Sequence, residues 1–429
     1  MGSFTISSST KTYKSLLSNP KFIYLKPTTT PKIVKFGIPF PLQHQLSSTF
    51  KMCTKAVLSS GVTNPKPFPK IASESTGPVP IKQLLDVVLI AAKTGAEVVM
   101  EAVNKPRNIS YKGVTDLVTD TDKMSEAAIL GVVAENFGDH LILGEEGGII
   151  GNTSSDYLWC IDPLDPTVFV EHSLAMSGIR VSVGTSLSTA GGTDAVTLPV
   201  FMAPLAHVSW LAGVVGAPGS WSCVANGTTN FAHGYPSFAV SVGVLFRGKP
   251  VAAAVVEFVG GPHCWNTRTF SASAGGGAFC NGNKVHVSQT DLVERSLLVT
   301  GFGYEHDDAW LTNIGLFKEF TDISRGVRRL GAAAVDMCHV ALGIVEAYWE
   351  YRLKPWDMAA GVLIVEEAGG TVTRMDGEGF CVFDRSVLVS NGLMHAKLLE
   401  RISPATEKLK NDGMDVSLWF KPENYNTDL

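Results

Sequence analysis

The chain has 429 residues, of which 45% are hydrophobic and 17% are charged, and its formal net charge is −5. This composition is typical of a globular protein with a large core, and it excludes a disordered chain. No apolar run is both long and clean enough to span a bilayer. The seven cysteines are scattered without a CxxC pair, which favours reduced, buried thiols over a disulfide framework or a zinc site.

Residues 1–73 contain ten lysines but no arginine, aspartate or glutamate, and the first acid is Glu74. An acid-free segment rich in serine and threonine is typical of a cleaved transit peptide, and the lack of arginine favours a chloroplast over a mitochondrion. The alternative is a disordered tail that stays in the cytosol. Without those ten lysines, 25 of the 35 basic residues remain with all 40 acidic ones, a net charge near −15. We therefore expect no nucleic-acid partner.

Residues 81–104 have apolar side chains at helical spacing, and residues 123–137 predict a second helix. A short strand is expected over 140–143. Residues 238–246 and 251–258 predict two strands joined by a turn, and Asn281-Gly282 predicts a second tight hairpin. Strands with few intervening helices indicate an antiparallel sheet in this half of the chain.

The pattern changes to alternating helices and strands after about residue 291. Helices are predicted over 310–320, 332–345 and 358–368, and strands over 296–300, 347–351, 371–375 and 387–390. The predicted domains are a leader (1–73), a first domain (74–290) interrupted by 166–226, a second domain (291–405) and a tail (406–429).

Two acidic motifs lie far apart in the chain. In Asp162-Pro163-Leu164-Asp165, the proline restrains a turn that can aim both carboxylates and the Leu164 carbonyl at one point. Asp357 stands at the start of an apolar helix, where it could equally be an ordinary N-cap. Several oxygen ligands are what Mg²⁺ requires, but neither motif alone distinguishes a metal site from a surface turn or a cap.

The strings around these motifs carry a family resemblance. Residues 159–165 (WCIDPLD) and 227–234 (GTTNFAHG) join, when 166–226 are removed, into WCIDPLDGTTNFAHG. That string resembles the signature of the inositol monophosphatase family, metal-dependent and lithium-sensitive phosphatases. The later strings WDMAAG (356–361) and EAGG (367–370) resemble its second signature. The string LVTGFGYEH (298–306), with the leader, is most similar to the plant plastid members.

The resemblance implies a layered α-β-α-β-α sandwich, with a mainly antiparallel first sheet and a mixed second sheet. It implies Mg²⁺ ligands, a catalytic group and a substrate-binding group, and it makes a homodimer the expected assembly. The implied metal ligands are Glu145, Asp162, the Leu164 carbonyl, Asp165 and Asp357. The implied catalytic residues are Glu145, Thr228 and Asp122, with Asp122 holding Thr228. The implied substrate contacts are Gly227, Thr228, Thr229, Ala333, Glu350 and Asp357.

Residues 166–226 separate an implied metal ligand from the implied phosphate-binding helix, and three interpretations stay open. The segment could be translated intron sequence, because the motif resumes cleanly after it. It could be a real loop that leaves the site intact, at a closure cost of roughly 3–4 kcal/mol plus a constant. It could also supply Thr167 in place of Thr228, although Pro166 would then lack the N–H of the replaced glycine.

The resemblance predicts a magnesium-dependent phosphatase that acts on inositol monophosphate, a small phosphorylated polyol, in the chloroplast stroma for inositol biosynthesis. Histidinol phosphate, galactose 1-phosphate and bisphosphates are alternative substrates. A folded but catalytically impaired chain is the alternative that is not an enzyme.

Overall fold

The computed structural model describes residues 68–111, 117–165, 227–303 and 305–429, without the side chains of Tyr111, Leu117, Asp165 and Gly227. All of these residues belong to one compact unit, Lys66–Leu429. The helices of this described part are α1 (Ile81–Ala102), α2 (Asp120–Asn136), α3 (Gly227–His233), α4 (Asp308–Ile323), α5 (Ala333–Ala341), α6 (Pro355–Glu367), α7 (His395–Asn411) and a short 3₁₀ turn, Val293–Arg295.

The first sheet has the strand order β10-β9-β8-β7-β6-β5-β3-β4, and its pairs are antiparallel except for β3 beside β5. A separate small ribbon pairs β1 with β2. The strands are β1 (Ile109–Tyr111), β2 (Leu117–Thr119), β3 (Leu141–Gly144), β4 (Gly148–Gly151), β5 (Tyr157–Asp165), β6 (Phe238–Phe246), β7 (Lys249–Val259), β8 (Asn266–Ser273), β9 (Gly277–Cys280) and β10 (Asn283–Lys284).

The second sheet has the order β12-β11-β13-β15-β14 and is mixed, because β11 runs parallel to both neighbours while β15 runs antiparallel to both of its own. Its strands are β11 (Leu297–Thr300), β12 (Gly326–Arg328), β13 (Ala347–Tyr351), β14 (Thr371–Thr373) and β15 (Ser386–Ser390).

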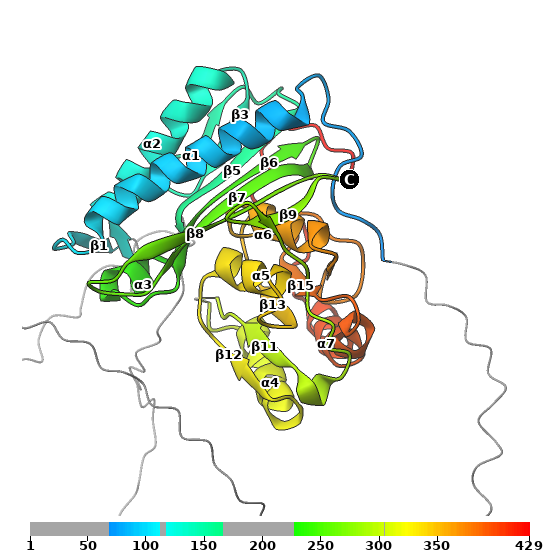
Figure 1. Ribbon diagram of the computed structural model, residues 1–429. Coiled ribbons are helices and arrows are strands. Elements are labelled where there is room, and N and C mark those ends of the chain that lie inside the picture. The colour runs from blue at the N-terminus through cyan, green and yellow to red at the C-terminus, as the bar shows by residue number, and fades with distance from the viewer. Residues whose placement is uncertain (1–67, 112–116, 166–226, 304) are drawn as a thin grey trace, which may run out of the picture. The chain divides into compact units, whose positions relative to one another are not determined.

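Helices and sheets alternate in five layers (Figure 1). α1 and α2 cover one face of the first sheet, α5 and α6 lie between the two sheets, and α4 and α7 cover the outer face of the second. Strands β6 and β7 are buried along almost their whole length, because helices press on both of their faces. The predicted α-β-α-β-α sandwich, with a mainly antiparallel first sheet and a mixed second sheet, is confirmed.

Periodicity located most of the regular elements. The predicted helix 81–104 is α1, and its buried side chains include Leu84, Val88 and Ala91. The predicted hairpins are β6–β7, which turns at Arg247-Gly248, and β9–β10, which turns at Asn281-Gly282. All four of these turn residues have positive φ, as tight two-residue hairpins require.

Residues 68–73 pack against the core although the sequence placed them in the leader. The Ile71 side chain is buried, and the backbone N–H groups of Ile71 and Ala72 donate to the two carboxylate oxygens of Glu366 at 2.7 and 2.9 Å. Glu366 lies in the last turn of α6, so this helix binds the incoming chain at its C-terminal end. The folded unit therefore begins before residue 74.

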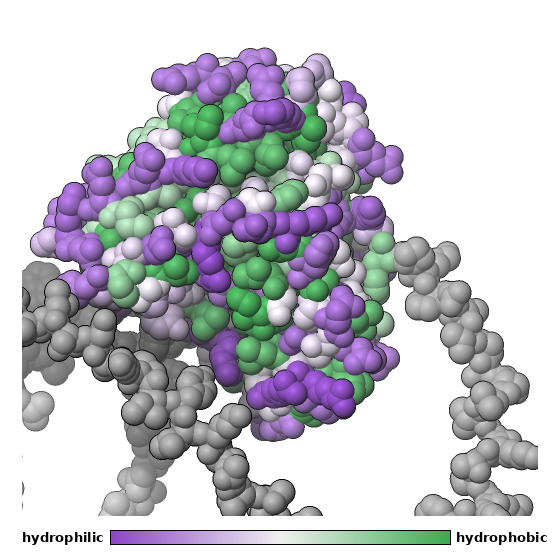
Figure 2. Space-filling view, in the orientation of Figure 1, coloured by the Kyte–Doolittle hydropathy of each residue, from purple (hydrophilic) through white to green (hydrophobic). Residues whose placement is uncertain are grey.

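The outward surface is mixed. Figure 2 shows hydrophilic residues spread among hydrophobic ones on the face that it draws, as amphipathic outer helices such as α1 would give. None of the helices that the structure describes is long and apolar enough to cross a bilayer. The five cysteines within the described ranges are free thiols. Cys160 and Cys338 are buried as predicted, Cys280 and Cys381 are half-buried, and Cys264 is exposed, contrary to that prediction.

Candidate active site

The site begins at the N-terminus of α2, where a capping box buries a carboxylate. Thr119 is the N-cap, and Asp122 accepts hydrogen bonds from both the backbone N–H (2.9 Å) and the hydroxyl (2.5 Å) of Thr119. Such a reciprocal cap fixes the first turn of a helix. The Asp122 carboxylate is therefore held rigidly, with one oxygen left to face another element.

That second oxygen binds Thr228. The Thr228 hydroxyl donates to Asp122 Oδ1 at 2.5 Å, and both residues are fully buried. This is the contact that the family resemblance implied between residues 106 positions apart. Burial raises the pKa of Asp122 to about 6, and the hydrogen bonds from Thr119 and Thr228 oppose that rise. Above that pH the carboxylate is ionised and keeps the Thr228 hydroxyl as a donor.

Two more buried side chains of α2 hold the neighbouring loops. Ser125 Oγ donates to the Pro163 carbonyl at 3.0 Å, inside the Asp162–Asp165 turn. Glu126 Oε1 accepts from the Glu146 backbone N–H at 3.2 Å, and a Cβ at Gly144 would lie only 2.0 Å from the same oxygen. Sequence reasoning missed both. Their signal was the spacing 122, 125, 126, which places them on one helical face with Asp122.

The predicted ligands Glu145 and Asp162 meet where the parallel strands β3 and β5 reach the same end of the first sheet. β3 and β5 are parallel with Gly144 opposite Ile161, and the Glu145 N–H donates to the Ile161 carbonyl at 3.2 Å. Glu145, which directly follows β3, therefore lies beside Asp162, which belongs to the neighbouring strand β5. Asp162 is buried, and its Oδ1 accepts from the Leu164 N–H at 3.0 Å. Asp165 pairs with Ala239 at the end of β5, and its side chain lies outside the described part.

Asp357 comes from the second half of the chain, in the first turn of α6. Its Oδ2 accepts from the Lys354 N–H at 2.7 Å, so Asp357 caps the helix from position N3, whereas the N-cap that the sequence considered for Asp357 is Lys354. α6 packs directly on β6: a Cβ at Gly243 would lie 2.8 Å from the Ala359 Cβ. This close approach brings the start of α6 against the strand beside β5. Burial raises the pKa of Asp357, and Lys354 opposes the rise.

Glu350 is the last but one residue of β13 and lies close to Asp357. It is buried and accepts a hydrogen bond from the Tyr348 hydroxyl. Burial raises the pKa of Glu350 to about 7, the Tyr348 bond opposes the rise, and the negative charge of Asp357 adds to it. The backbone of Gly301 lies against this carboxylate, because a Cβ there would be 1.9 Å from Glu350 Oε2.

The remaining predicted substrate contacts stand at helix starts. Gly227, Thr228 and Thr229 form the first turn of α3, and Ala333 is the first residue of α5. Asn230 ties α3 to the second half of the chain, because its amide donates to the Leu330 carbonyl at 3.1 Å. Their assignment as substrate contacts stays a prediction.

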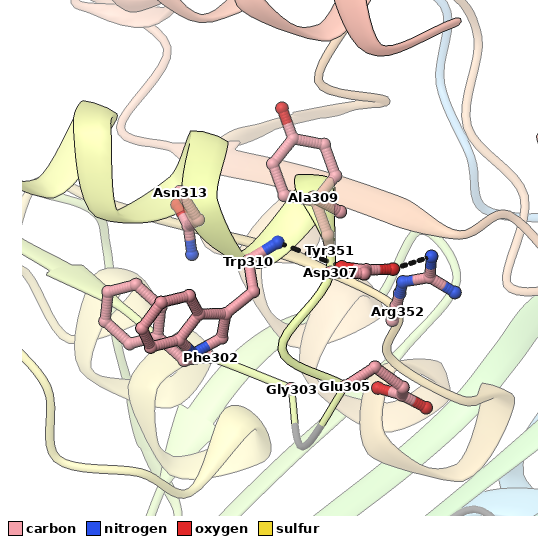
Figure 3. A pocket seen from close by; sticks show the side chains of 9 residues that line it. All are labelled: Phe302, Gly303, Glu305, Asp307, Ala309, Trp310, Asn313, Tyr351 and Arg352. Carbon is pink, nitrogen blue, oxygen red and sulfur yellow. Dashed lines mark hydrogen bonds and ion pairs between the residues drawn. The ribbon is translucent and has the colours of Figure 1, made fainter. Parts of the chain in front are cut away.

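A small hollow lies at the ends of β11 and β13, beside the first turn of α4. Figure 3 shows Phe302 and Trp310 on one side of it and the ion pair of Arg352 with Asp307 on another. Arg352 adopts positive φ (66°) and starts the loop that leads to Asp357. The hollow is therefore lined in part by the chain that connects Glu350 to α6.

The donors at this site are hard oxygens, as Mg²⁺ requires: Asp162 and Asp357 are buried, and Glu145 is half-buried. No three His, Cys, Asp or Glu side chains form a closed metal-binding group within the described residues. The predicted ligand Asp165 has no described side chain. The described residues thus fit a hard cation in donor chemistry and burial, and the complete ligand set stays a prediction.

A family model described as "Inositol monophosphatase family" matches residues 81–190 and 226–410. The chain belongs to the inositol monophosphatase family. The members are metal-dependent phosphatases, so the predicted family and phosphatase class are confirmed. Residues 191–225 fall between the two matched stretches, within the segment that the sequence marked as an interruption.

Inositol monophosphatase relatives come from plants, bacteria and animals. The chain is 65% identical to "Phosphatase IMPL1, chloroplastic" of Arabidopsis thaliana, covering 90% of this chain and 88% of that one. It is 29% identical to the human "Inositol monophosphatase 1", covering 76% and 94%. The solved structure of an inositol monophosphatase from Anabaena is similar, with 31% identity, coverage of 76% and 96%, and a TM-score of 0.54.

Proposed function

We propose that this chain is a magnesium-dependent phosphomonoesterase that hydrolyses inositol monophosphate to inositol and phosphate. The observation that carries the proposal is the buried hydrogen bond between Thr228 and Asp122, beside the loops of Glu145 and Asp162. A buried hydroxyl held by a carboxylate in this way is suited to orienting a water molecule. Family membership supports the phosphatase chemistry.

Glu145, Asp162, the Leu164 carbonyl, Asp165 and Asp357 would hold the magnesium. When bound, the metal would lower the pKa of a water molecule and neutralise phosphate charge. The Thr228 hydroxyl donates a hydrogen bond to Asp122. The lone pairs of Thr228 Oγ1 therefore stay available to accept a hydrogen bond from the attacking water. The Glu145 carboxylate would orient the same water for in-line attack. Glu350 would accept a hydrogen bond from a hydroxyl of the polyol.

The proposed location is the chloroplast stroma, and the proposed assembly is a homodimer. An acid-free leader and the word "chloroplastic" in the name of the Arabidopsis relative support the location. Family resemblance alone supports the dimer. A bisphosphate is the second candidate substrate, because a relative from Aquifex aeolicus, 30% identical, is named "Fructose-1,6-bisphosphatase/inositol-1-monophosphatase".

The Thr228–Asp122 contact predicts the effect of Asp122→Asn. An amide offers one acceptor where Asp122 now accepts from Thr119 and Thr228 on two oxygens, so Thr228 would lose its fixed orientation. We expect kcat for inositol monophosphate to fall by roughly 100-fold or more, the usual contribution of acid–base positioning. Steady-state phosphate release at saturating Mg²⁺ measures it.

The matched control is Asp120→Asn on the same helix turn. Asp120 is exposed and accepts only from the Asn108 side chain among the described contacts, at 2.9 Å. Its kcat should stay near that of the unaltered chain. Equal losses of kcat in Asp122→Asn and Asp120→Asn would refute the role assigned to Asp122. The same assay on histidinol phosphate, galactose 1-phosphate and fructose bisphosphate, with lithium titration, separates the candidate substrates.

A further inference from the structure

The C-terminal segment 412–429 lies beyond the last residue matched by the family model, residue 410. It follows α7 on the outer face of the second sheet, yet the C-terminus lies next to the first sheet, away from α7 (Figure 1). The segment therefore crosses from the second sheet to the first. We refer to residues 412–429 as the C-terminal strap.

The strap is fixed first on Arg385. Arg385 pairs with Asp415 at 2.7 Å and donates from Nε to the Ser417 carbonyl at 2.9 Å. Its guanidinium also stacks over the Trp419 ring at 4.5 Å. The backbone N–H of Trp419 donates to the Phe383 carbonyl at 3.1 Å. Trp419 is thus held in position from both its backbone and its ring.

The Trp419 indole then reaches the loop that carries Asp357. Its Nε1–H donates to the Leu353 carbonyl at 3.0 Å. The N–H of the same peptide group belongs to Lys354 and donates to Asp357 Oδ2 at 2.7 Å. One planar peptide therefore links the indole to the carboxylate, and its rotation would break both bonds. Hydrogen bonds at the two ends of one amide also polarise each other.

Aromatic contacts secure the same loop. Phe420 packs edge-on against Trp356, with ring centroids 5.1 Å apart, and Lys354 Nζ lies 5.8 Å from the centre of the Trp419 ring. The strap therefore contacts Lys354 and Trp356 just before the predicted ligand, and both residues are buried.

We propose that Trp419 is a positioning residue that sets the Asp357 carboxylate through the Leu353–Lys354 peptide. The inference rests on the proposed function, because Asp357 matters here as a magnesium ligand. Mutating a partner that orients a metal ligand typically costs roughly 10- to 100-fold in metal affinity or activity. The strap would thereby make magnesium affinity depend on a segment outside the matched family region.

The far end of the strap supplies a matched control. Tyr425 is buried, and its hydroxyl accepts from the Gly248 N–H at 2.9 Å at the β6–β7 turn. Its hydroxyl has no described contact with the Leu353–Asp357 loop. Removing that hydroxyl should loosen the strap without touching the peptide that orients Asp357.

The test compares Trp419→Phe with Tyr425→Phe in the full chain. Calorimetry gives the Mg²⁺ dissociation constant, the melting temperature without metal gives stability, and phosphate release gives the Mg²⁺ concentration for half-maximal rate. We expect Trp419→Phe to weaken Mg²⁺ binding by on the order of 10-fold and to raise the half-maximal concentration in parallel. Tyr425→Phe should lower the melting temperature and leave Mg²⁺ affinity unchanged.

Equal Mg²⁺ affinities in Trp419→Phe and the unaltered chain would overturn the inference and leave the proposed function standing. No Mg²⁺ binding by the unaltered chain, and none by the chain in which residue 165 is joined to 227, would overturn both. If Trp419→Phe does not fold, semisynthesis can place 3-benzothienylalanine at 419, which keeps the ring shape and replaces only the N–H donor. The same loss of affinity is then expected, and normal affinity would count against the indole bond.

Discussion

Residues Asp122, Ser125 and Glu126 show how one helical face can position several parts of a site. Each is buried and polar, and each contacts a different segment: Thr228, Pro163 or the Glu145–Glu146 loop. Buried polar groups without partners are costly, so these side chains hold their loops as firmly as the loops hold them. The sequence revealed Asp122 through its motif. It did not reveal Ser125 and Glu126, because a serine and a glutamate inside a helix are the pattern of a solvent-exposed face.

Gly301 sets the position of Glu350, and Gly301→Ala should disturb substrate binding. The new Cβ would meet Glu350 Oε2 at 1.9 Å and Cδ at 2.4 Å, so the carboxylate must move. Losing one hydrogen bond to a charged group corresponds to roughly 10- to 100-fold in kcat/KM, carried here mainly by KM. Steady-state kinetics on inositol monophosphate measure both constants.

Gly315→Ala is the comparison for that variant. A Cβ at Gly315 would have nothing within 4 Å, and the residue lies inside α4. The change should leave both kinetic constants alone and stabilise the fold by about 0.5–1 kcal/mol, because alanine is favoured in helix interiors. An unchanged KM in Gly301→Ala would remove Glu350 from the substrate contacts.

Among the elements, most helices and several short strands, such as 347–351, were predicted, whereas β5, β8 and α7 were not. α1 and the β6–β7 hairpin follow from periodicity and turn residues. α3 has only seven residues and no apolar stripe to detect. α7 was missed because Pro404 stands inside it, and part of it was assigned to the tail that begins at 406. The contacts of the strap join distant residues, which local patterns cannot show.

α7 begins at a buried histidine that makes stability depend on pH. His395 bonds Thr373 of β14 and Ser390 of β15, both at 2.9 Å, and burial lowers its pKa to about 3. Between pH 6.5, the pKa of His395 in the unfolded chain, and about pH 3, its pKa in the folded chain, His395 is protonated only when the chain is unfolded. Its contribution to stability is therefore complete above pH 6.5 and is lost as pH falls toward 3, by at most about 1.4 kcal/mol per pH unit.

His395→Gln should flatten that dependence. The amide can keep a hydrogen bond to one hydroxyl but takes up no proton, so the variant is less stable at pH 7.5 yet loses less stability on acidification. Urea unfolding of both proteins from pH 7.5 to 5 gives the two slopes. Parallel slopes would show that His395 is not the group responsible.

For the whole molecule, the segment 166–226 decides whether the chain as printed is an enzyme. It separates Asp165 from Gly227 in sequence, and its own structure lies outside the described residues. Joining 165 to 227 should raise kcat, because misplacing a reacting group by about 1 Å costs about 100-fold. Parallel assays of both chains check this, and sequencing the transcript across the junction shows whether the segment exists. A faster chain with the segment would favour the role considered for Thr167.

The central claim is that buried carboxylates from both halves of the chain serve a magnesium-dependent phosphatase. Its most direct test is phosphate release from inositol monophosphate by the purified protein, without residues 166–226, as Mg²⁺ is titrated from zero. The account predicts no turnover in a chelator, turnover that saturates with Mg²⁺ and is inhibited by lithium, and loss of most of it in Asp165→Asn. Turnover that ignores Mg²⁺, or near-normal activity of Asp165→Asn at saturating Mg²⁺, would contradict it.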